Sequence, residues 1–248
     1  MPRVKDKVVL ITGAASGLGA ADARRLAEEG ARVVLTDVNE EMGREVASSI
    51  PGALFLQHDV RDEARWQAVI AETLAHFGRL DVLVNNAGLV KFADIEQIDL
   101  AEFRLQHEVM TEGTLLGCKH AIPAMRQGGG GSIINVSSIG AIKGIAEIVA
   151  YAAAKGAILS MTRSIAVHCQ NHGYRIRCNA ILPGAHETPM TAQAAREVSV
   201  DSNGMAQVVA HGQGTPLDVA NLVLFLASDE SRHINGAELV IDNCETIR

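Results

Sequence analysis

Aromatic residues are scarce in this chain of 248 residues. Phe, Trp and Tyr make up 3% of it, whereas hydrophobic residues of all kinds make up 48%. The core must therefore be built mainly from Val, Ile, Leu and Ala, a composition that suits buried parallel strands under alanine-rich helices. The length is appropriate for one large α/β domain, and no linker or change of composition divides the chain.

The chain also lacks any run of Lys or Arg, and its formal net charge is -7. A nucleic-acid surface needs clustered positive charge, so we expect no nucleic-acid partner. No hydrophobic run is long enough to span a membrane, and residues 8–11 are too few for the hydrophobic part of a signal peptide. We therefore expect a cytoplasmic protein that acts on a small molecule and does not contact a membrane.

The four cysteines show neither a CxxC pair nor any other spacing typical of a metal site. They fit small buried residues or free thiols in a reducing compartment, and we expect no metal. His186 and Glu187 are adjacent polar residues that could be read as metal ligands or catalytic groups. Solvated loop residues are the more common case, and this is the interpretation we adopt.

A glycine-rich turn follows the first predicted strand, residues 8–11, and opens a helix. Gly13, Gly17 and Gly19 let the backbone approach a pyrophosphate, and the helix N-terminus offers free N–H groups. Such a turn can also be merely structural. The next predicted strand ends at Asp37, whose carboxylate could accept hydrogen bonds from the ribose hydroxyls of NAD and would repel the 2′-phosphate of NADP. The pattern predicts a dinucleotide site with a preference for NAD.

Strand and helix patterns go on alternating, with strands at 53–57 and 81–84 and a helix at 62–77. This alternation implies a parallel sheet with right-handed crossovers. Asp59 follows the third strand and is either exposed or faces an adenine amino group, in which case Val60 could pack on the ring.

The fourth predicted strand is followed by Asn85-Asn86-Ala87-Gly88. These small and amide residues would either stabilise the edge of the sheet or line the cofactor crevice, and the sequence is compatible with both.

Three polar residues are spaced in a way that suits proton transfer. Ser138 falls at the end of a predicted buried strand, where open α/β sheets bind ligands. Tyr151 and Lys155 are four residues apart on an alanine-rich helix and so share a face. A cation beside a phenol favours phenolate, although desolvation opposes that shift. The alternative is a packed tyrosine beside a solvated lysine.

Taken together, these motifs resemble the short-chain dehydrogenase/reductase family. The resemblance is carried by Thr12-Gly-x-x-x-Gly-x-Gly19, Asn85-Asn-Ala-Gly88, Ser138, Tyr151-x-x-x-Lys155, and Pro183-Gly184 before Thr188. It covers nearly the whole chain. More narrowly, residues 173–179, the turn at 188–190 and residues 222–232 are similar to bacterial 3β/17β-hydroxysteroid dehydrogenases.

The resemblance implies one Rossmann-type, doubly wound α/β domain over residues 1–248, with a seven-stranded parallel sheet and helices on both faces. Residues 1–130 would form the dinucleotide-binding half and residues 131–248 the catalytic and substrate half. Tyr151 would be the general acid/base, Lys155 would lower its pKa and bond the nicotinamide ribose, and Ser138 would orient the substrate oxygen.

The resemblance also implies a set of residues around NAD, with Pro183, Gly184 and Thr188 at its nicotinamide end. The full set is Thr12, Gly13, Ser16, Gly17, Leu18, Gly19, Asp37, Val38, Asp59, Val60, Asn86, Ala87, Gly88, Tyr151, Lys155, Pro183, Gly184 and Thr188.

The chain departs from the family at one functional position. Family members usually carry an Asn that helps hold a water linking the catalytic lysine to solvent, and this chain has Met110 there. A thioether is only a weak acceptor. Either the main-chain carbonyl holds the water and Met110 merely packs, or the proton relay is slower or differently routed. We expect activity to be retained, because the carbonyl remains whatever the side chain.

Apolar residues surround the predicted site, namely Ile139, Ile142, Ile145, Val149 and Met190. Of these, Ile145 and Met190 are expected to contact the substrate together with Ser138 and Tyr151. No cluster of Lys or Arg offers a carboxylate or phosphate clamp, and Lys143 alone is expected to be solvated. These features favour an apolar alcohol or ketone, either a steroid-like or other cyclic secondary alcohol or a small aliphatic or aromatic one.

The periodic pattern weakens over residues 185–214, a polar and alanine-rich stretch that suits a mobile lid over the substrate. A helix at 217–227 and a last strand at 238–241 follow. The resemblance implies subunit interfaces built by this strand and by the helices near 100–125 and 151–170, so we expect a homotetramer, with a dimer as the alternative.

Two other functions compete with an NAD-dependent alcohol dehydrogenase. A 3-oxoacyl carrier-protein reductase would normally use NADPH and a basic docking surface, which Asp37 and the negative net charge disfavour. A dinucleotide-binding sensor without turnover is supported only by Met110, and the intact Ser138, Tyr151 and Lys155 argue against it.

Overall fold

Seven parallel strands form one sheet in the computed structural model, which describes residues 2–197 and 212–247. The strand order is β3-β2-β1-β4-β5-β6-β7, as the predicted fold class requires. The strands are β1 (Val8–Thr12), β2 (Arg32–Asp37), β3 (Leu54–Gln57), β4 (Val82–Asn85), β5 (Gly131–Val136), β6 (Ile176–Pro183) and β7 (Glu238–Ile241). The chain winds outward from β1 to β3 and returns to β4, so the order reverses between β1 and β4. In an open sheet this is where a ligand crevice forms.

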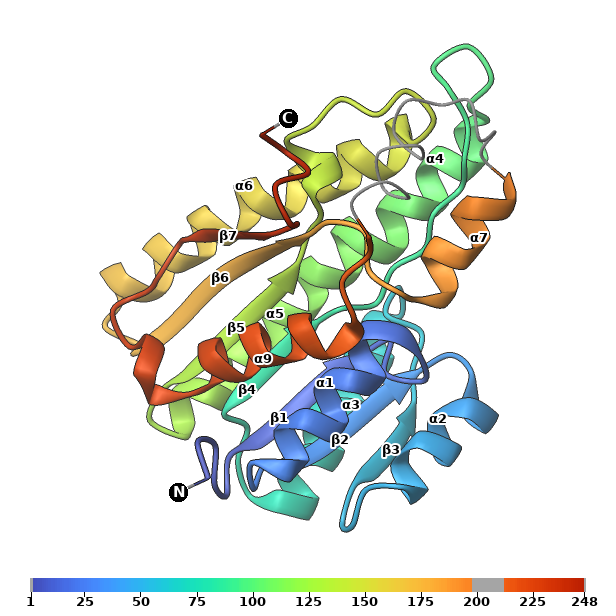
Figure 1. The fold of residues 1–248 in the computed structure, drawn as a ribbon. Coiled ribbons are helices and arrows are strands. Elements are labelled where there is room, and N and C mark those ends of the chain that lie inside the picture. The colour runs from blue at the N-terminus through green and yellow to red at the C-terminus, as the bar shows by residue number, and fades with distance from the viewer. Residues whose placement is uncertain (1, 198–211, 248) are drawn as a thin grey trace.

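Helices cover both faces of the sheet, which confirms the predicted layers (Figure 1). The helices α1 (Gly17–Glu28), α2 (Glu40–Ser48) and α9 (Pro216–Ala227) share a buried core with one face. The helices α3 (Glu63–Phe77), α5 (Gly113–Gln127) and α6 (Val149–Asn171) pack on the other. Almost every strand residue in the centre of the sheet is buried Val, Ile or Leu, as expected for strands that are covered twice.

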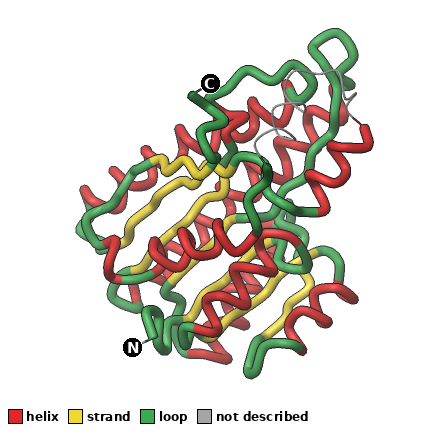
Figure 2. The backbone as a smooth tube through the Cα atoms, viewed as in Figure 1, coloured by secondary structure: helices red, strands yellow, loops and turns green. Residues whose placement is uncertain are grey.

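Shorter helices lie near the carboxyl ends of the strands. They are α4 (Leu100–His107), the π-helical turn η1 (Glu108–Glu112), η2 (Ile139–Ala141) and α7 (Pro189–Glu197). The short helix η3 (Asp229–Ser231) lies at the opposite end of the sheet, where Asp229 pairs with Lys7, directly before β1. Figure 2 shows long loops gathered at the carboxyl ends of the strands. The predicted lid therefore contains a helix, α7, while residues 198–211 of that lid lie outside the described residues. Among the helices that the structure describes, none is both long and apolar enough to span a membrane.

Helix starts differ in how their first N–H groups are satisfied. Asn39 and Asp62 cap α2 and α3 by accepting hydrogen bonds from the main chain, and Thr215 forms a capping box with Asp218 at the start of α9. Ser16 precedes α1 without forming a side-chain cap. The N-terminus of α1 thus keeps donors for another partner, in line with a pyrophosphate site.

Asp22 is a charged residue type in an apolar environment. Asp22 on α1 is fully buried, and its two carboxylate oxygens have no hydrogen-bond partner in the part of the chain that the structure describes. Burial raises the pKa of this carboxyl well above its ordinary value, because a low-dielectric environment disfavours the charged form. Asp22 therefore destabilises the fold at neutral pH.

We predict that Asp22→Ala raises the free energy of unfolding at pH 7 by about 1 to 3 kcal/mol, the usual cost of an unsatisfied buried polar group. Burial raises the pKa of the Asp22 carboxyl in the folded protein. The free energy of unfolding therefore falls as the pH rises above about 4, which is the pKa of an Asp carboxyl in the unfolded chain. The gain in the variant should therefore be largest at neutral pH and shrink towards pH 4. Urea unfolding at several pH values measures it.

Glu28→Ala is the matched control, because it removes an exposed carboxylate from the same helix. Its effect should stay within about 0.5 kcal/mol. A loss of stability in Asp22→Ala at pH 7 would show that this carboxyl has a stabilising partner.

Candidate active site

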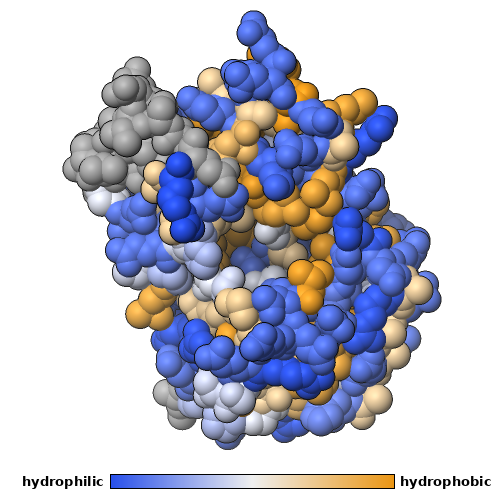
Figure 3. Space-filling view, turned by 90° about the vertical axis from the view of Figure 1, so that its right-hand side faces the viewer, coloured by the Kyte–Doolittle hydropathy of each residue, from blue (hydrophilic) through white to orange (hydrophobic). Residues whose placement is uncertain are grey.

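A cavity of about 950 Å³ opens at the carboxyl ends of the strands. Figure 3 shows a hollow near the centre of this face, with hydrophobic residues along much of its rim. Most of the predicted cofactor residues border the cavity, namely Gly13, Ser16, Gly17, Leu18, Asp37, Asn86, Gly88, Tyr151, Lys155, Pro183, Gly184 and Thr188. The predicted substrate residues Ser138, Ile145, Tyr151 and Met190 border it too.

The glycine turn adopts backbone conformations that need glycine. Gly13 and Gly17 have φ values of 65° and 54°, which side chains other than glycine rarely adopt. A Cβ on Gly19 would lie 2.5 Å from the Asn86 amide nitrogen, so this glycine is needed for close packing. Asn86 itself donates to the main-chain oxygen of Gly13 at 3.0 Å. The glycine turn therefore faces the cavity at Gly13 and Gly17, with the side chains of Ser16 and Leu18 beside them.

Three predicted residues support the glycine turn from behind. The Thr12 hydroxyl accepts hydrogen bonds from the main-chain nitrogens of Asn86 and Ala87, each at 3.0 Å. Neither Thr12, Gly19 nor Ala87 borders the cavity. Asn85 is buried and bonds Asn135 on the adjacent strand at 2.8 Å, so Asn85 stabilises the sheet while Asn86 lines the crevice.

Asp37 lies where a ribose would be recognised. Its carboxylate accepts a hydrogen bond from the Ala15 main-chain nitrogen at 3.0 Å and another from Asn39 at 2.9 Å. These bonds fix the carboxylate at the end of β2, beside the glycine turn. Val38 follows it with 61% of its surface exposed, and its side chain does not border the cavity.

Asp59 and Val60 lie outside the cavity wall. Asp59 forms an ion pair with Arg61 at 2.6 Å, and this guanidinium lowers the pKa of the Asp59 carboxyl. Val60 is buried in the core under β4 and packs against Gly113. The Val60 side chain is thus covered by the start of α5 in this structure, and its contact with an adenine ring stays a prediction.

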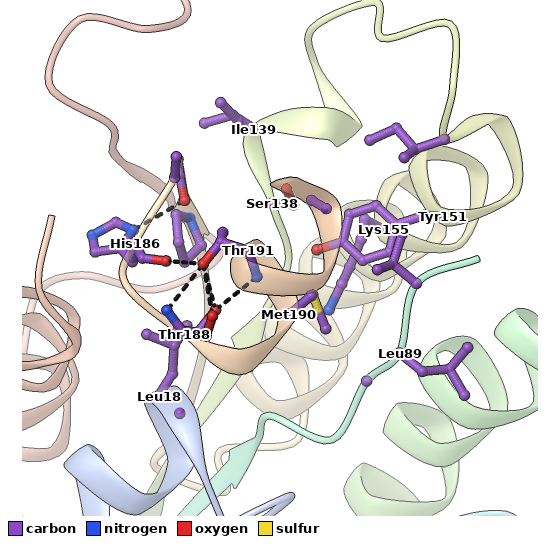
Figure 4. Close-up of a pocket in the computed structure, with 18 of the residues that line it drawn as sticks. Leu18, Leu89, Ser138, Ile139, Tyr151, Lys155, His186, Thr188, Met190 and Thr191 are labelled. Carbon is purple, nitrogen blue, oxygen red and sulfur yellow. Dashed lines mark hydrogen bonds between the residues drawn. The ribbon is translucent and has the colours of Figure 1, made fainter. Parts of the chain in front are cut away.

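Ser138, Tyr151 and Lys155 converge at the other end of the cavity. Figure 4 shows the phenolic oxygen of Tyr151 pointing towards Ser138, with Lys155 behind the ring. The Lys155 ammonium lies 5.5 Å from the Tyr151 ring centroid. The Ser138 hydroxyl oxygen accepts a hydrogen bond from the Gly140 main-chain nitrogen at 3.1 Å, and its O–H interacts with the Tyr151 phenol.

Two hydrogen bonds fix α6 against the end of β5. The Lys155 ammonium donates to the main-chain oxygen of Val136 at 2.7 Å, and the Ser137 hydroxyl donates to the main-chain oxygen of Lys155 at 2.9 Å. Only 3% of Lys155 is exposed. The Lys155 ammonium is thus buried and hydrogen-bonded within the site, and the alternative of a solvated lysine is ruled out.

Burial shifts the pKa values of both groups. It raises the pKa of Tyr151, against a lowering effect of the hydrogen bond with Ser138, and it lowers the pKa of Lys155 to about 8. The expectation that the ammonium brings the Tyr151 pKa below its ordinary value is therefore wrong for this arrangement. Desolvation of the buried phenol is the largest influence on its pKa, and the hydrogen bond with Ser138 opposes it.

A family model described as "Enoyl-(Acyl carrier protein) reductase" matches residues 13–244. The chain is 41% identical to the trans-4-hydroxycyclohexanecarboxylate dehydrogenase of Sinomonas cyclohexanicum over 98% of its own length and 94% of that protein. The chain belongs to the short-chain dehydrogenase/reductase family.

Two further relatives of this short-chain dehydrogenase/reductase support the assignment. The 3-beta-hydroxysteroid dehydrogenase of Comamonas testosteroni is 38% identical over 97% of this chain and 96% of that protein. The crystal structure of levodione reductase superimposes with a TM-score of 0.92 at 35% identity and covers 99% of both chains. The predicted family, fold and enzyme class, an oxidoreductase, are thereby confirmed.

Met110, the departure from the family pattern, is fully buried in the π-helical turn η1. It packs with Ala154 and Ile158 of α6. Gly88 lies close to both the Met110 sulfur and the Lys155 ammonium, because a Cβ added to Gly88 would be 3.5 Å from the sulfur and 3.6 Å from the ammonium. The thioether thus fills space beside the catalytic lysine. The π-helical turn was not predicted, although such turns often occur at functional sites.

His186, on the loop after β6, is buried rather than solvated. His186 is only 4% exposed, and its Nδ1 lies 3.0 Å from the main-chain oxygen of Gly184. The expectation of a solvated histidine is wrong, because the His186 ring packs against Gly214, the last residue of the predicted lid. Glu187 is exposed, as predicted. No cluster of metal-binding side chains occurs within the described residues.

Thr188 starts α7 and has a partner that sequence reasoning missed. The Thr191 hydroxyl donates to the main-chain oxygen of His186 at 2.5 Å, and the two threonine hydroxyls lie 3.1 Å apart. Met190, next to Thr188, reaches into the cavity near Tyr151 and Lys155 (Figure 4). These contacts depend on the fold of the loop and leave no mark in the residue spacing.

The predicted substrate wall is partly revised. Ile139 and Ile145 border the cavity, but Ile142 is 52% exposed, and neither Ile142 nor Val149 lines it. Lys143 is not freely solvated, because its ammonium donates to the main-chain oxygen of Glu245 at 2.9 Å. Further apolar wall residues that the sequence did not reveal are Leu89, Val90, Phe92, Ala146, Ile148 and Ala194.

We predict that Met110→Asn changes kcat for alcohol oxidation by less than about threefold, since the buried thioether packs beside Lys155 and a main-chain route for the proton does not depend on it. Steady-state kinetics in light and heavy water measure this. Met110→Leu, which keeps the packing without an acceptor, is the control. A many-fold rise in kcat for the Asn variant alone would instead show that the thioether restricts proton transfer.

Proposed function

We propose that this short-chain dehydrogenase/reductase interconverts an apolar cyclic secondary alcohol and its ketone with NAD as the cofactor. The observation that supports this best is one cavity that joins the Asp37 carboxylate and the glycine turn to the group of Ser138, Tyr151 and Lys155. A dinucleotide laid along the carboxyl ends of the strands would connect these two ends.

The residues that would hold the dinucleotide follow from this geometry. The uncapped start of α1 would bind the pyrophosphate, Asp37 the adenine ribose, and Lys155 the nicotinamide ribose. Asp59 remains a proposed partner of the adenine amino group. Pro183 and Thr188 would border the nicotinamide end. When bound, the nicotinamide supplies the hydride chemistry.

The protein's own task is to manage the hydroxyl proton. Tyr151 would take that proton during oxidation and return it during reduction, acting as general base and general acid. Ser138 would donate a hydrogen bond to the substrate oxygen, because its own oxygen is already engaged by Gly140. Lys155 would hold positive charge next to the phenol in a site with little water.

The substrate class is inferred from the walls of the cavity and from the relatives. Ile139, Ile145 and Met190 offer an apolar surface beside Ser138 and Tyr151, which suits a hydrocarbon ring. The named relatives act on a hydroxycyclohexanecarboxylate and on a 3-beta-hydroxysteroid. We therefore favour alicyclic and steroid-like secondary alcohols over acyclic ones.

A panel of steroidal, alicyclic and aromatic alcohols, followed by the absorbance of the reduced cofactor, tests the function. We expect alicyclic or steroidal alcohols to be oxidised, and Tyr151→Phe to lower kcat by about 10² to 10⁴ with little change in the Kd for NAD. Bound NAD without turnover on any alcohol of the panel would favour a sensor over an enzyme.

Asp37→Ala should weaken NAD binding and relax the discrimination against NADP, because the variant loses both an acceptor for the ribose hydroxyls and a charge that repels the 2′-phosphate. We expect the ratio of kcat/KM values for NAD and NADP to fall by at least about tenfold. Glu28→Ala, which removes an exposed carboxylate at the end of α1 opposite the glycine turn, serves as the control for net charge. Equal use of both cofactors by the unaltered protein would overturn the assignment.

We also propose that the protein is a cytoplasmic homotetramer. Leu115 on α5, Val167 on α6 and Val240 on β7 expose 49%, 53% and 45% of their surfaces. These elements are the ones expected at subunit interfaces, and contact with another subunit would bury them. Light scattering should give a mass near four times 26.3 kDa, and a monomer would refute the assembly.

A further inference from the structure

The C-terminal turn, residues 242–246, forms part of the cavity wall through Glu245. Asp242 organises the turn, because its carboxylate accepts hydrogen bonds from the main-chain nitrogens of Cys244 at 3.1 Å and Thr246 at 2.7 Å, and from the Thr246 hydroxyl at 2.7 Å. The main-chain nitrogen of Gly184 donates to the oxygen of Ile241 at 2.9 Å. The turn is therefore fixed next to the start of the lid.

Two adjacent residues of the C-terminal turn have an unfavourable backbone conformation. Asn243 and Cys244 have φ values of 48° and 68°, in the left-handed region where residues other than glycine are uncommon. Asn tolerates this region, whereas Cys does so much less well. Backbone strain of this kind persists where the surrounding structure imposes it, often at a functional site.

The strained turn places Glu245 in contact with two loops. The Glu245 carboxylate accepts a hydrogen bond from the main-chain nitrogen of Ala185 at 3.1 Å, on the loop that leads to Thr188. The Lys143 ammonium donates to the main-chain oxygen of Glu245 at 2.9 Å. Because Lys143 lies on the loop that carries Ser138, the turn joins the two loops that border the substrate end of the cavity.

Lys143 and Glu245 are also mostly buried, with 22% and 17% of their side chains exposed. The Lys143 ammonium lies 3.9 Å from the Glu245 carboxylate and also interacts with the charge of Asp242. Its positive charge is thus balanced locally. Of its three N–H groups, one is used by the Glu245 main chain, so donors remain for a ligand.

We propose that Lys143 and Glu245 determine substrate specificity, with the Lys143 ammonium donating a hydrogen bond to a second, uncharged oxygen of a cyclic alcohol. This inference rests on the proposed function. The surrounding wall residues Ile139, Ile145 and Met190 are apolar, so this pair supplies a polar anchor beside a hydrocarbon surface. A hydroxyl or carbonyl oxygen suits the anchor better than a carboxylate does, because two acidic side chains already compensate the ammonium.

The test compares four substrates: cyclohexanol, cyclohexane-1,4-diol, 4-hydroxycyclohexanone and 4-hydroxycyclohexanecarboxylate. In the unaltered protein we expect kcat/KM for the diol and the hydroxyketone to exceed that for cyclohexanol by at least about tenfold, the worth of one hydrogen bond to a charged group. Lys143→Met, which keeps an unbranched chain without the donors, should bring this ratio to about one. Its Kd for NAD should change by less than about twofold, because Lys143 lies at the substrate end of the cavity.

Lys91→Met is the matched control, because Lys91 also borders the cavity but lies on the loop after β4. It should leave the ratio unchanged. Glu245→Gln keeps an oxygen acceptor for the Ala185 nitrogen while removing the compensating charge. In this variant we expect kcat/KM for 4-hydroxycyclohexanecarboxylate to rise about fivefold relative to the diol, since the Lys143 charge is then less balanced.

The outcomes separate the two levels of inference. If the unaltered protein oxidises none of these alcohols, the proposed function fails, and the specificity proposal fails with it. If it oxidises them and Lys143→Met keeps the same preference, or lowers all substrates equally, only the specificity proposal is overturned. A preference of the unaltered protein for the carboxylate over the diol would also contradict it.

Discussion

The hydrogen bond between the buried Lys155 ammonium and the main-chain oxygen of Val136 is the constraint on which the site depends. An ammonium removed from water must be hydrogen-bonded, so α6 is fixed where its lysine meets the last residue of β5. The reverse bond, from Ser137 to the main-chain oxygen of Lys155, fixes the same junction from the strand side. As a result, Tyr151 lies over Ser138 in a definite position, and no further ion pair is needed to orient it.

The rest of the cavity follows from the topology of the sheet. β1 and β4 are paired neighbours, but the chain continues from β1 to α1 on one face of the sheet and from β4 to α5 on the other. The glycine turn after β1 and the Asn86 segment after β4 therefore border one crevice at this point. The loops after β5 and β6 then close the substrate end, where Lys143 and Glu245 bridge them. The residues proposed for nucleotide recognition and those proposed for proton transfer thus lie at opposite ends of one cavity and follow different strands.

The strands and the reacting residues could be predicted because their signals are local. Buried parallel strands appear as short apolar runs, and a residue that follows such a run lies at the ligand-binding edge of the sheet, which is how Ser138 was placed. Tyr151 and Lys155 were placed on one helix face by their spacing of four residues. The burial of His186 and the bond between Lys143 and Glu245 depend on contacts between distant segments, so no spacing revealed them. The pKa of Tyr151 was misjudged because burial, unlike neighbouring charge, cannot be read from a motif.

The most direct test of the account is to titrate the Tyr151 phenol itself. The chain has two tyrosines, so in Tyr174→Phe the ultraviolet absorbance of tyrosinate reports on Tyr151 alone. Measured at saturating NAD, its midpoint should coincide with the midpoint of the pH dependence of alcohol oxidation. Ser138→Ala should move both midpoints upwards, because the hydrogen bond with Ser138 lowers the Tyr151 pKa. A phenol that stays protonated across the pH range in which the rate rises would contradict the account.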